Sequence, residues 1–138
     1  MLKLLIPIID RHGAQEAARH GAFLFAERCV SEVEIVEVLD DLGLDRSVAF
    51  HSIGALRRLE KQAMQDALLQ TRAILDDAGV PYTWKRVFGP PERVIASSAR
   101  LGHADMVVLD ATGLGFLRKW SMLARLRRLT RTPVTLVQ

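Results

Sequence analysis

Two glycines in the last third of the chain lie where a protein could hold a phosphate group. Gly113 and Gly115 belong to a short loop, 110–115, that joins the apolar run 106–109 to the basic segment 116–130. A strand, a glycine loop and a helix in this order place free backbone N–H groups and the positive end of a helix dipole at one point. The segment therefore predicts a site for an anion, such as the phosphate of a nucleotide.

These features also have ordinary structural explanations. Glycine is common in tight turns between a strand and a helix, whether or not a ligand binds there. A basic helix is commonly a solvated face, and the alternatives are a rim that attracts phosphate or the contact surface of an acidic partner. Asp10, which ends the first apolar run, could bind a ligand or cap a helix. The residues alone leave these alternatives open.

The positive charge of the chain is concentrated beside the glycine loop. The net charge is +3, yet six basic and no acidic residues follow Asp110, while the preceding part carries 13 basic and 16 acidic residues. The basic residues fall on different faces of the predicted helix, so we expect no nucleic-acid partner. Phe116, Trp120 and Leu123 share one helical face, which predicts core or interface positions rather than a platform for stacking bases.

The composition is that of one soluble globular domain. The chain has 138 residues, of which 49% are hydrophobic and 25% are charged. No apolar run approaches the ~18 residues that a membrane span needs, and the opening segment 1–10 lacks the cleavage site of a signal peptide, so we expect a cytoplasmic protein. The single cysteine, Cys29, excludes an intramolecular disulfide, and we expect it to be buried rather than reactive.

The sequence contains no recognisable catalytic or metal-binding arrangement. The four histidines show no ligand spacing, so no metal site is expected. The phosphate loop of nucleotide hydrolases and the glycine fingerprint of dinucleotide-binding proteins are both absent. No two groups are spaced for acid–base or nucleophilic catalysis, so we expect the protein to act by binding and not as an enzyme.

Apolar periodicity alternates between strand-like runs and helical stripes along the whole chain. The predicted strands are 4–9, 33–39, 82–88, 105–109 and 134–137, and the predicted helices are 14–28, 53–78, 92–101 and 116–130, with a loop at 40–52. This alternation predicts an α/β fold: a doubly wound, Rossmann-like parallel sheet of five strands with helices on both faces. Ligands of such sheets bind at the carboxyl ends of the strands, so Asp10 and the loop 110–115 are the two candidate mouths.

The whole chain, 1–138, resembles a single domain of the universal stress protein family. Residues 5–10 resemble the family's first strand, an apolar run with a proline that ends in aspartate. Residues 89–95 resemble its Gly-Asp-Pro-Ala-Glu helix entry, and 104–109 its Ala-Asp-Leu-Ile-Val-Met strand. Residues 121–134 align without gaps to its last helix and the Pro-Val start of its last strand. The resemblance implies the strand order 3-2-1-4-5 and an adenine-nucleotide site.

The glycine pattern departs from that of family members that bind ATP, which carry Gly-x-x-Gly, a spacer, and then Gly-Ser or Gly-Thr. Here Asp110 stands for the first glycine and Gly113 for the second, while Trp120 and Ser121 stand for the final pair after a shorter spacer. The first strand also has one extra residue before Asp10. A carboxylate repels phosphate and an indole takes up space, so we expect ATP binding in the usual pose to be weak or absent.

The resemblance implies a small stress-response protein with a regulatory or protective role. ATP is the possible cofactor, and two alternatives remain. One is a sensor that binds ATP or another adenine nucleotide through a loop reshaped around Gly113, Gly115 and Arg118, and the other is a module that binds an acidic partner through the last helix. The residues expected to line the nucleotide site are Ile8, Asp10, Val38, Leu109, Asp110, Thr112, Gly113, Gly115 and Ser121.

The last predicted strand is apolar and is expected at an edge of the sheet. It consists of Val134, Thr135, Leu136 and Val137. An apolar edge strand promotes aggregation unless another strand pairs with it. We therefore expect a two-fold homodimer in which these strands meet, as the resemblance also implies.

Overall fold

A computed structural model describes the backbone of residues 1–39 and 53–138 and the side chains of residues 1–39 and 61–138. Its strands are β1 (Leu2–Ile8), β2 (Val30–Leu39), β3 (Tyr82–Phe88), β4 (Met106–Asp110) and β5 (Val134–Val137). Its helices are α1 (Gln15–Ala26), α2 (Ile53–Asp77), α3 (Pro91–Leu101) and α4 (Phe116–Leu129). Each predicted strand and helix is confirmed with small differences at its ends, and the predicted loop 40–52 lies outside the described residues.

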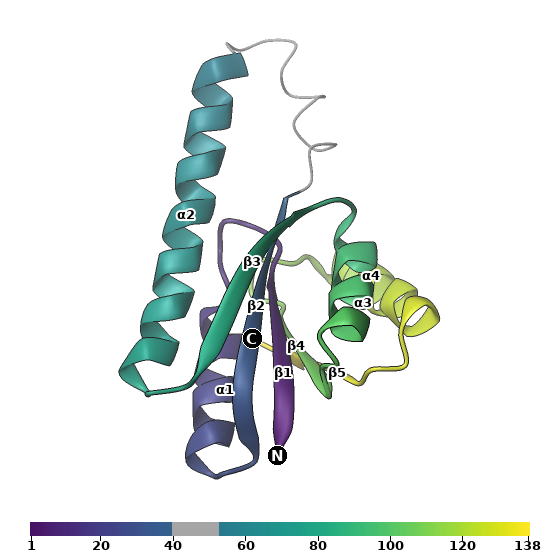
Figure 1. The fold of residues 1–138 in the computed structure, drawn as a ribbon. Coiled ribbons are helices and arrows are strands. Elements are labelled where there is room, and N and C mark those ends of the chain that lie inside the picture. Colours follow the sequence, from purple (N-terminus) through teal and green to yellow (C-terminus); the bar gives the residue numbers. More distant parts are fainter. Residues whose placement is uncertain (40–52) are drawn as a thin grey trace.

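The strands form one parallel sheet in the order β3-β2-β1-β4-β5. Helices α1 and α2 cover one face, and α3 and α4 cover the other (Figure 1). This confirms the doubly wound fold and the strand order that the resemblance implied. The chain leaves the centre in opposite directions from β1 and β4, so the loops that follow these two strands meet at the switch point where such sheets bind ligands.

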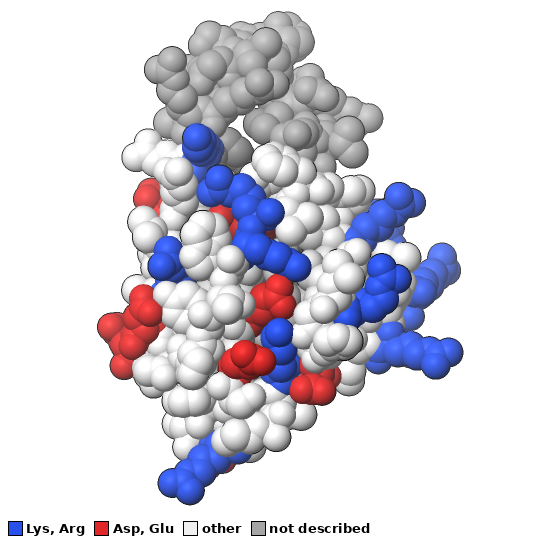
Figure 2. Space-filling view, viewed as in Figure 1, with Lys and Arg blue, Asp and Glu red and all other residues white. Residues whose placement is uncertain are grey.

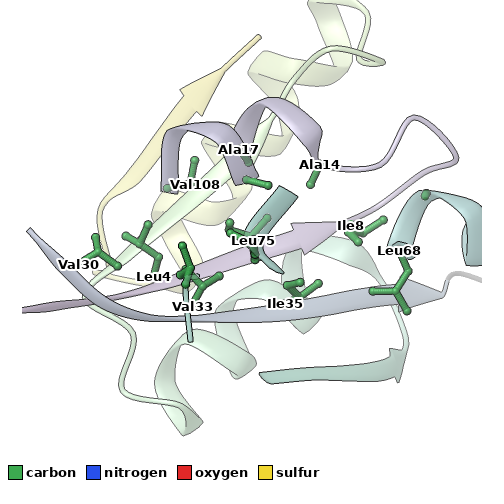
Figure 3. Close-up of a cluster of buried hydrophobic side chains, with 14 of the residues drawn as sticks. Leu4, Ile8, Ala14, Ala17, Val30, Val33, Ile35, Leu68, Leu75 and Val108 are labelled. Carbon is green, nitrogen blue, oxygen red and sulfur yellow. The ribbon is translucent and has the colours of Figure 1, made fainter. Parts of the chain in front are cut away.

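Two layers of apolar side chains fill the space between the sheet and its helices, because successive residues of a strand point to opposite faces. Leu4 and Ile8 of β1 pack toward α1 and α2 (Figure 3). Leu5 points to the other face, where it belongs to the cluster that includes Val36 and Leu109. The central strands are therefore buried on both faces, as their continuous apolar runs predict.

A buried hydroxyl on α2 fixes the loop between β1 and α1. Thr71 Oγ1 accepts a hydrogen bond from the Ala14 backbone N–H at 3.1 Å and donates one to the Ala67 carbonyl at 2.8 Å. Gly13, beside it, has a φ of +75°, and a Cβ there would lie 3.3 Å from the Ala67 carbonyl oxygen. The backbone angle favours glycine at this position, and a side chain would also crowd the Ala67 carbonyl.

Edge strand β3 is held by charged and aromatic contacts. Arg72 of α2 lies over the rings of Tyr82 and Trp84, 5.9 and 5.4 Å from their centroids. A hydrogen bond from Arg72 Nε to the Tyr82 hydroxyl raises the pKa of the guanidinium above its ordinary value. On β2, the buried Glu37 pairs with Arg86 at 3.4 Å. These contacts join β3 to both α2 and β2.

Cys29 is exposed, so the prediction of a buried thiol is wrong. Helix α1 ends at Ala26 rather than at residue 28, and Arg28 turns the chain with a φ of +62°. Cys29 therefore falls in a surface turn instead of continuing the helical stripe.

Within the described ranges, no helix is both long enough and apolar enough to cross a membrane.

Replacing the hydroxyl of Thr71 tests its role in fixing the β1–α1 loop. Thr71→Val keeps the shape of the side chain but leaves the Ala14 N–H buried without a partner, so we expect a loss of about 1–3 kcal/mol in the free energy of unfolding. Urea denaturation measures it. Thr71→Ser keeps the hydroxyl and is expected to lose less, and equal losses in the two variants would contradict the role of the hydrogen bond.

Candidate functional site

The candidate site is the mouth of the fold, where the loop after β1 meets the loop after β4. We use "mouth" for Asp10, His12, Asp110, Thr112 and Gly113, which these two loops bring together. The strands themselves are adjacent, with Leu4 in register with Met106 and Leu5 in register with Val107. The two candidate mouths named from the sequence, Asp10 and the loop 110–115, therefore lie at one place in the fold.

Asp110 is turned into the protein rather than toward a ligand, and only 7% of it is exposed. Its Oδ2 accepts hydrogen bonds from the backbone N–H groups of Glu16 at 2.9 Å and Ala17 at 3.4 Å. Its Oδ1 accepts from the backbone N–H of Thr112 at 3.0 Å and from the Thr112 hydroxyl at 2.5 Å. Asp110 thus caps α1, whose own N-cap residue, Ala14, has no side-chain oxygen to do so.

This contact refines what the sequence predicted for Asp110. The expected negative charge is present beside the glycine loop, but it is neutralised in part by the positive end of the α1 dipole. The same carboxylate accepts the backbone N–H groups of Glu16 and Ala17, so these donors already have a partner. At the α1 end of the mouth, the place of an anion is therefore already taken by a side chain of the protein.

His12 and Asp10 fill the space in front of Gly113. A Cβ at Gly113 would lie 2.8 Å from Cγ of His12 and 2.9 Å from Oδ2 of Asp10, so any larger residue would force these side chains to move. Asp10 Oδ1 accepts the His12 backbone N–H at 2.9 Å and lies 3.3 Å from the imidazole Nδ1. Gly113 therefore serves the close packing of the two loops, and the backbone approach that glycine permits is used by an imidazole.

His12 is a site residue that sequence reasoning missed. It was considered only as a metal ligand, a role for which its spacing to the other histidines is wrong. The available clue was its position two residues after the aspartate that ends the first apolar run, opposite a glycine loop. Within the described part of the chain, no group of three or more His, Cys, Asp or Glu side chains could hold a metal ion.

The N-terminus of α4 remains open. Its N-cap residue, Gly115, makes no side-chain cap, and the first turn contains no acidic residue. A Cβ at Gly115 would have no neighbour within 4 Å. The first N–H groups of an α-helix have no partner within the helix, so this end of α4 could receive an anion, unlike the capped end of α1.

The other predicted site residues lie below or beside the mouth. Ile8 is buried in the apolar cluster on the α1–α2 side of the sheet, and Val38 and Leu109 are buried in the cluster on the other side. Ser121 is exposed on α4, beyond its first turn. The structure brings Asp10, Asp110, Thr112 and Gly113 together.

Trp120 is not a core residue. It is 53% exposed and packs edge to face against Phe116, which is 71% exposed, with 6.1 Å between the ring centroids. The core alternative predicted for these two residues is therefore wrong, and the interface alternative stays a prediction. The crowding that the structure places at Gly113 comes from His12 and Asp10, whereas the indole contacts another ring of α4.

Solved structures share this fold at low identity. A protein of the universal stress protein family from Burkholderia pseudomallei is 19% identical, with 98% of this chain and 94% of that chain covered and a TM-score of 0.69. The universal stress protein from Archaeoglobus fulgidus in complex with dAMP is 15% identical, with 100% and 98% covered and a TM-score of 0.67. A family protein from Arabidopsis thaliana with AMP bound is 14% identical, with 99% and 91% covered and a TM-score of 0.67.

At such low identities the structural likenesses show the fold alone, so membership of a family has to come from the sequence comparisons. A comparison with curated protein sequences found no match. The sequence profile of the universal stress protein family, however, matches the chain from residue 1 to residue 138. With the parallel sheet in the order 3-2-1-4-5 and the resemblance of its segments, this match establishes that the chain belongs to the universal stress protein family.

Proposed function

We propose that this universal stress protein is a cytoplasmic regulatory or protective protein that acts by binding, and that its mouth binds ATP weakly or not at all in the family's usual pose. The observation that carries the proposal is the packing of His12 and Asp10 against Gly113. The exposed free thiol of Cys29 suits a reducing compartment such as the cytoplasm.

Charge and space both oppose a triphosphate at the mouth. A phosphate held by the backbone near Gly113 would displace the imidazole and lie near the Asp10 carboxylate. Two like charges ~4 Å apart repel by about 1 kcal/mol in water and by about 4 kcal/mol at the effective dielectric of a protein surface. The N–H groups of Glu16 and Ala17, which could offset this repulsion, already bind Asp110.

Binding without turnover is supported by what surrounds His12. Its imidazole pairs with Asp10, as a catalytic base often pairs with a carboxylate. Among the described residues, however, no hydroxyl or thiol is hydrogen-bonded to this histidine, and the nearby Thr112 hydroxyl donates to Asp110. In this arrangement Thr112 is not placed as a nucleophile that His12 would activate.

A second candidate function is an adenine-nucleotide sensor that uses the open end of α4. The uncapped N-terminus after Gly115 favours it, and Arg118 in the first turn adds positive charge. The family proteins from Archaeoglobus fulgidus and Arabidopsis thaliana were solved with dAMP and with AMP. A monophosphate needs one anion site rather than several, which suits a mouth with one helix end open.

Calorimetric titration with AMP and ATP separates the two candidates. We expect dissociation constants weaker than about 1 mM for the unaltered protein. His12→Ala empties the space before Gly113 and is expected to tighten binding, whereas His103→Asn removes an exposed imidazole after α3 and should change nothing. Micromolar nucleotide binding by the unaltered protein would contradict the proposal that His12 and Asp10 obstruct the mouth. If Gly113→Val then abolished that binding, the result would favour the adenine-nucleotide sensor.

We also propose that β5 pairs with the β5 of a second copy. The carbonyls of Pro133 and Val137 accept hydrogen bonds from the β4 side at 2.9 and 2.8 Å. Alternate residues of a strand turn their backbone groups to opposite sides, so those of Val134 and Leu136 face outward. All four side chains of β5 are only half-buried. Pairing with a second β5 would cover both these side chains and the outward backbone groups.

The exposed rings of α4 support the same interface. On α4, Phe116 lies nine positions before Arg125, and Trp120 lies nine positions before Leu129. Nine residues make about two and a half helical turns, so the two members of each pair lie on opposite flanks of the helix. Arg125 and Leu129 lie on the flank near α3, which packs over β1 and β2. The two rings therefore lie on the side of β5, where a second copy would bury them.

Light scattering after size exclusion tests the dimer. The unaltered protein should have twice the 15.4 kDa of the chain, and Leu136→Asp should have the mass of one chain, because a carboxylate at the paired edge would be buried beside its symmetry mate. Leu117→Asp makes the same change at a residue of α4 that is 82% exposed and should stay dimeric. A monomer before any substitution would contradict the proposal.

A further inference from the structure

A groove between α3 and α4 gathers most of the positive charge on that side of the molecule. It consists of two adjoining hollows of ≈ 460 and ≈ 720 Å³, which share Arg93 and Leu129 in their walls. We call this the α3–α4 groove. Figure 2 shows basic side chains gathered where Figure 1 places these two helices. The arginines that line it are Arg93, Arg100, Arg125, Arg128 and Arg131.

The charge in the groove is largely uncompensated. The single carboxylate in its walls belongs to Glu92, which pairs with Arg125 at 3.6 Å. The other four arginines of the groove make no ion pair with any described side chain. Arginine stays protonated in proteins, so the groove carries a net excess of positive charge, and like charges along one concave surface raise the local potential for anions.

The larger hollow also offers hydroxyl donors. Ser97, Thr130 and Thr132 line it together with arginines, and no carboxylate does. The Thr130 oxygen accepts the backbone N–H of Thr132 at 3.1 Å, so the Thr130 hydroxyl keeps its own hydrogen to donate. Guanidinium forks and hydroxyl donors are both suited to the oxygen atoms of phosphate groups.

The shape of the groove calls for an extended anion. Arg93 and Arg100 are seven residues apart on α3, which is about 10 Å along the helix axis, and Arg128 and Arg131 follow the opposite wall. This row is longer than one phosphate ion. The walls contain no aromatic side chain, so they lack the platforms on which the bases of single-stranded nucleic acids stack.

We propose that the α3–α4 groove binds an anion with several closely spaced phosphate groups, of the inorganic polyphosphate class. This site is separate from the mouth, since none of Asp10, His12, Asp110 and Gly113 lines it. The proposal does not depend on whether the mouth binds a nucleotide.

Titration of the full chain with tripolyphosphate, orthophosphate and a short single-stranded DNA tests the proposal. We expect tripolyphosphate to bind at least about tenfold more tightly than orthophosphate, because its additional phosphate groups can make further charge-assisted hydrogen bonds along the groove. Binding should weaken as salt is raised. Tighter binding of the DNA at equal charge would overturn the proposal in favour of a nucleic-acid surface, and equal binding of the two phosphates would overturn the extended site.

Matched arginine variants place the binding site. Arg93→Gln combined with Arg100→Gln should weaken tripolyphosphate binding at least about tenfold, and Arg128→Gln should weaken it from the other wall. Arg127→Gln removes the same charge from α4 outside the groove and should change the affinity less than about twofold. Equal losses of affinity in Arg127→Gln and Arg128→Gln would show that binding depends on the overall charge of the protein, which would overturn the proposed site. Unfolding midpoints check that each variant is folded.

Discussion

The carboxylate of Asp110 holds the centre of this fold together, because it joins two elements that meet at the switch point of the sheet. Residue 110 ends β4, yet its side chain caps α1, 94 residues away in the sequence. Hydrogen bonds to a charged group contribute about 1.5–3 kcal/mol each, and an anion at a helix N-terminus adds up to about 2 kcal/mol. A position that is glycine in the ATP-binding motif of the family therefore has a structural role in this chain.

The Asp110 cap takes up backbone N–H groups that the N-terminus of α1 presents at the mouth. Beside this cap, Asp10 accepts the backbone N–H of His12, and His12 lies against Gly113. The fold still offers one open helix end, at α4. A shared fold does not fix a shared ligand, since function depends on the side chains placed at the site. In this chain, side chains of both loops, among them Asp10, His12 and Asp110, lie at the switch point.

The sequence predicted the layers of this structure better than its contacts. Apolar periodicity predicted the strands and helices, because these depend on the local pattern of residues. The family resemblance predicted the order of the strands in the sheet, because it covers the whole chain. The cap formed by Asp110 could not be predicted, since nothing near Ala14 reveals a partner so distant in sequence. Cys29 was wrongly placed because α1 ends before it. His12 was missed because its neighbour Gly113 is close only in the folded chain.

The basic segment 116–130 shows how folding can redirect a charge pattern. In the sequence, its arginines follow the glycine loop and favour a phosphate there. In the structure, Arg125 and Arg128 line the α3–α4 groove together with Arg93, while the mouth has the carboxylates of Asp10 and Asp110. Charges attract a ligand most strongly where they converge on one concave surface. An extended phosphate anion is therefore favoured between the two helices rather than at the glycine loop.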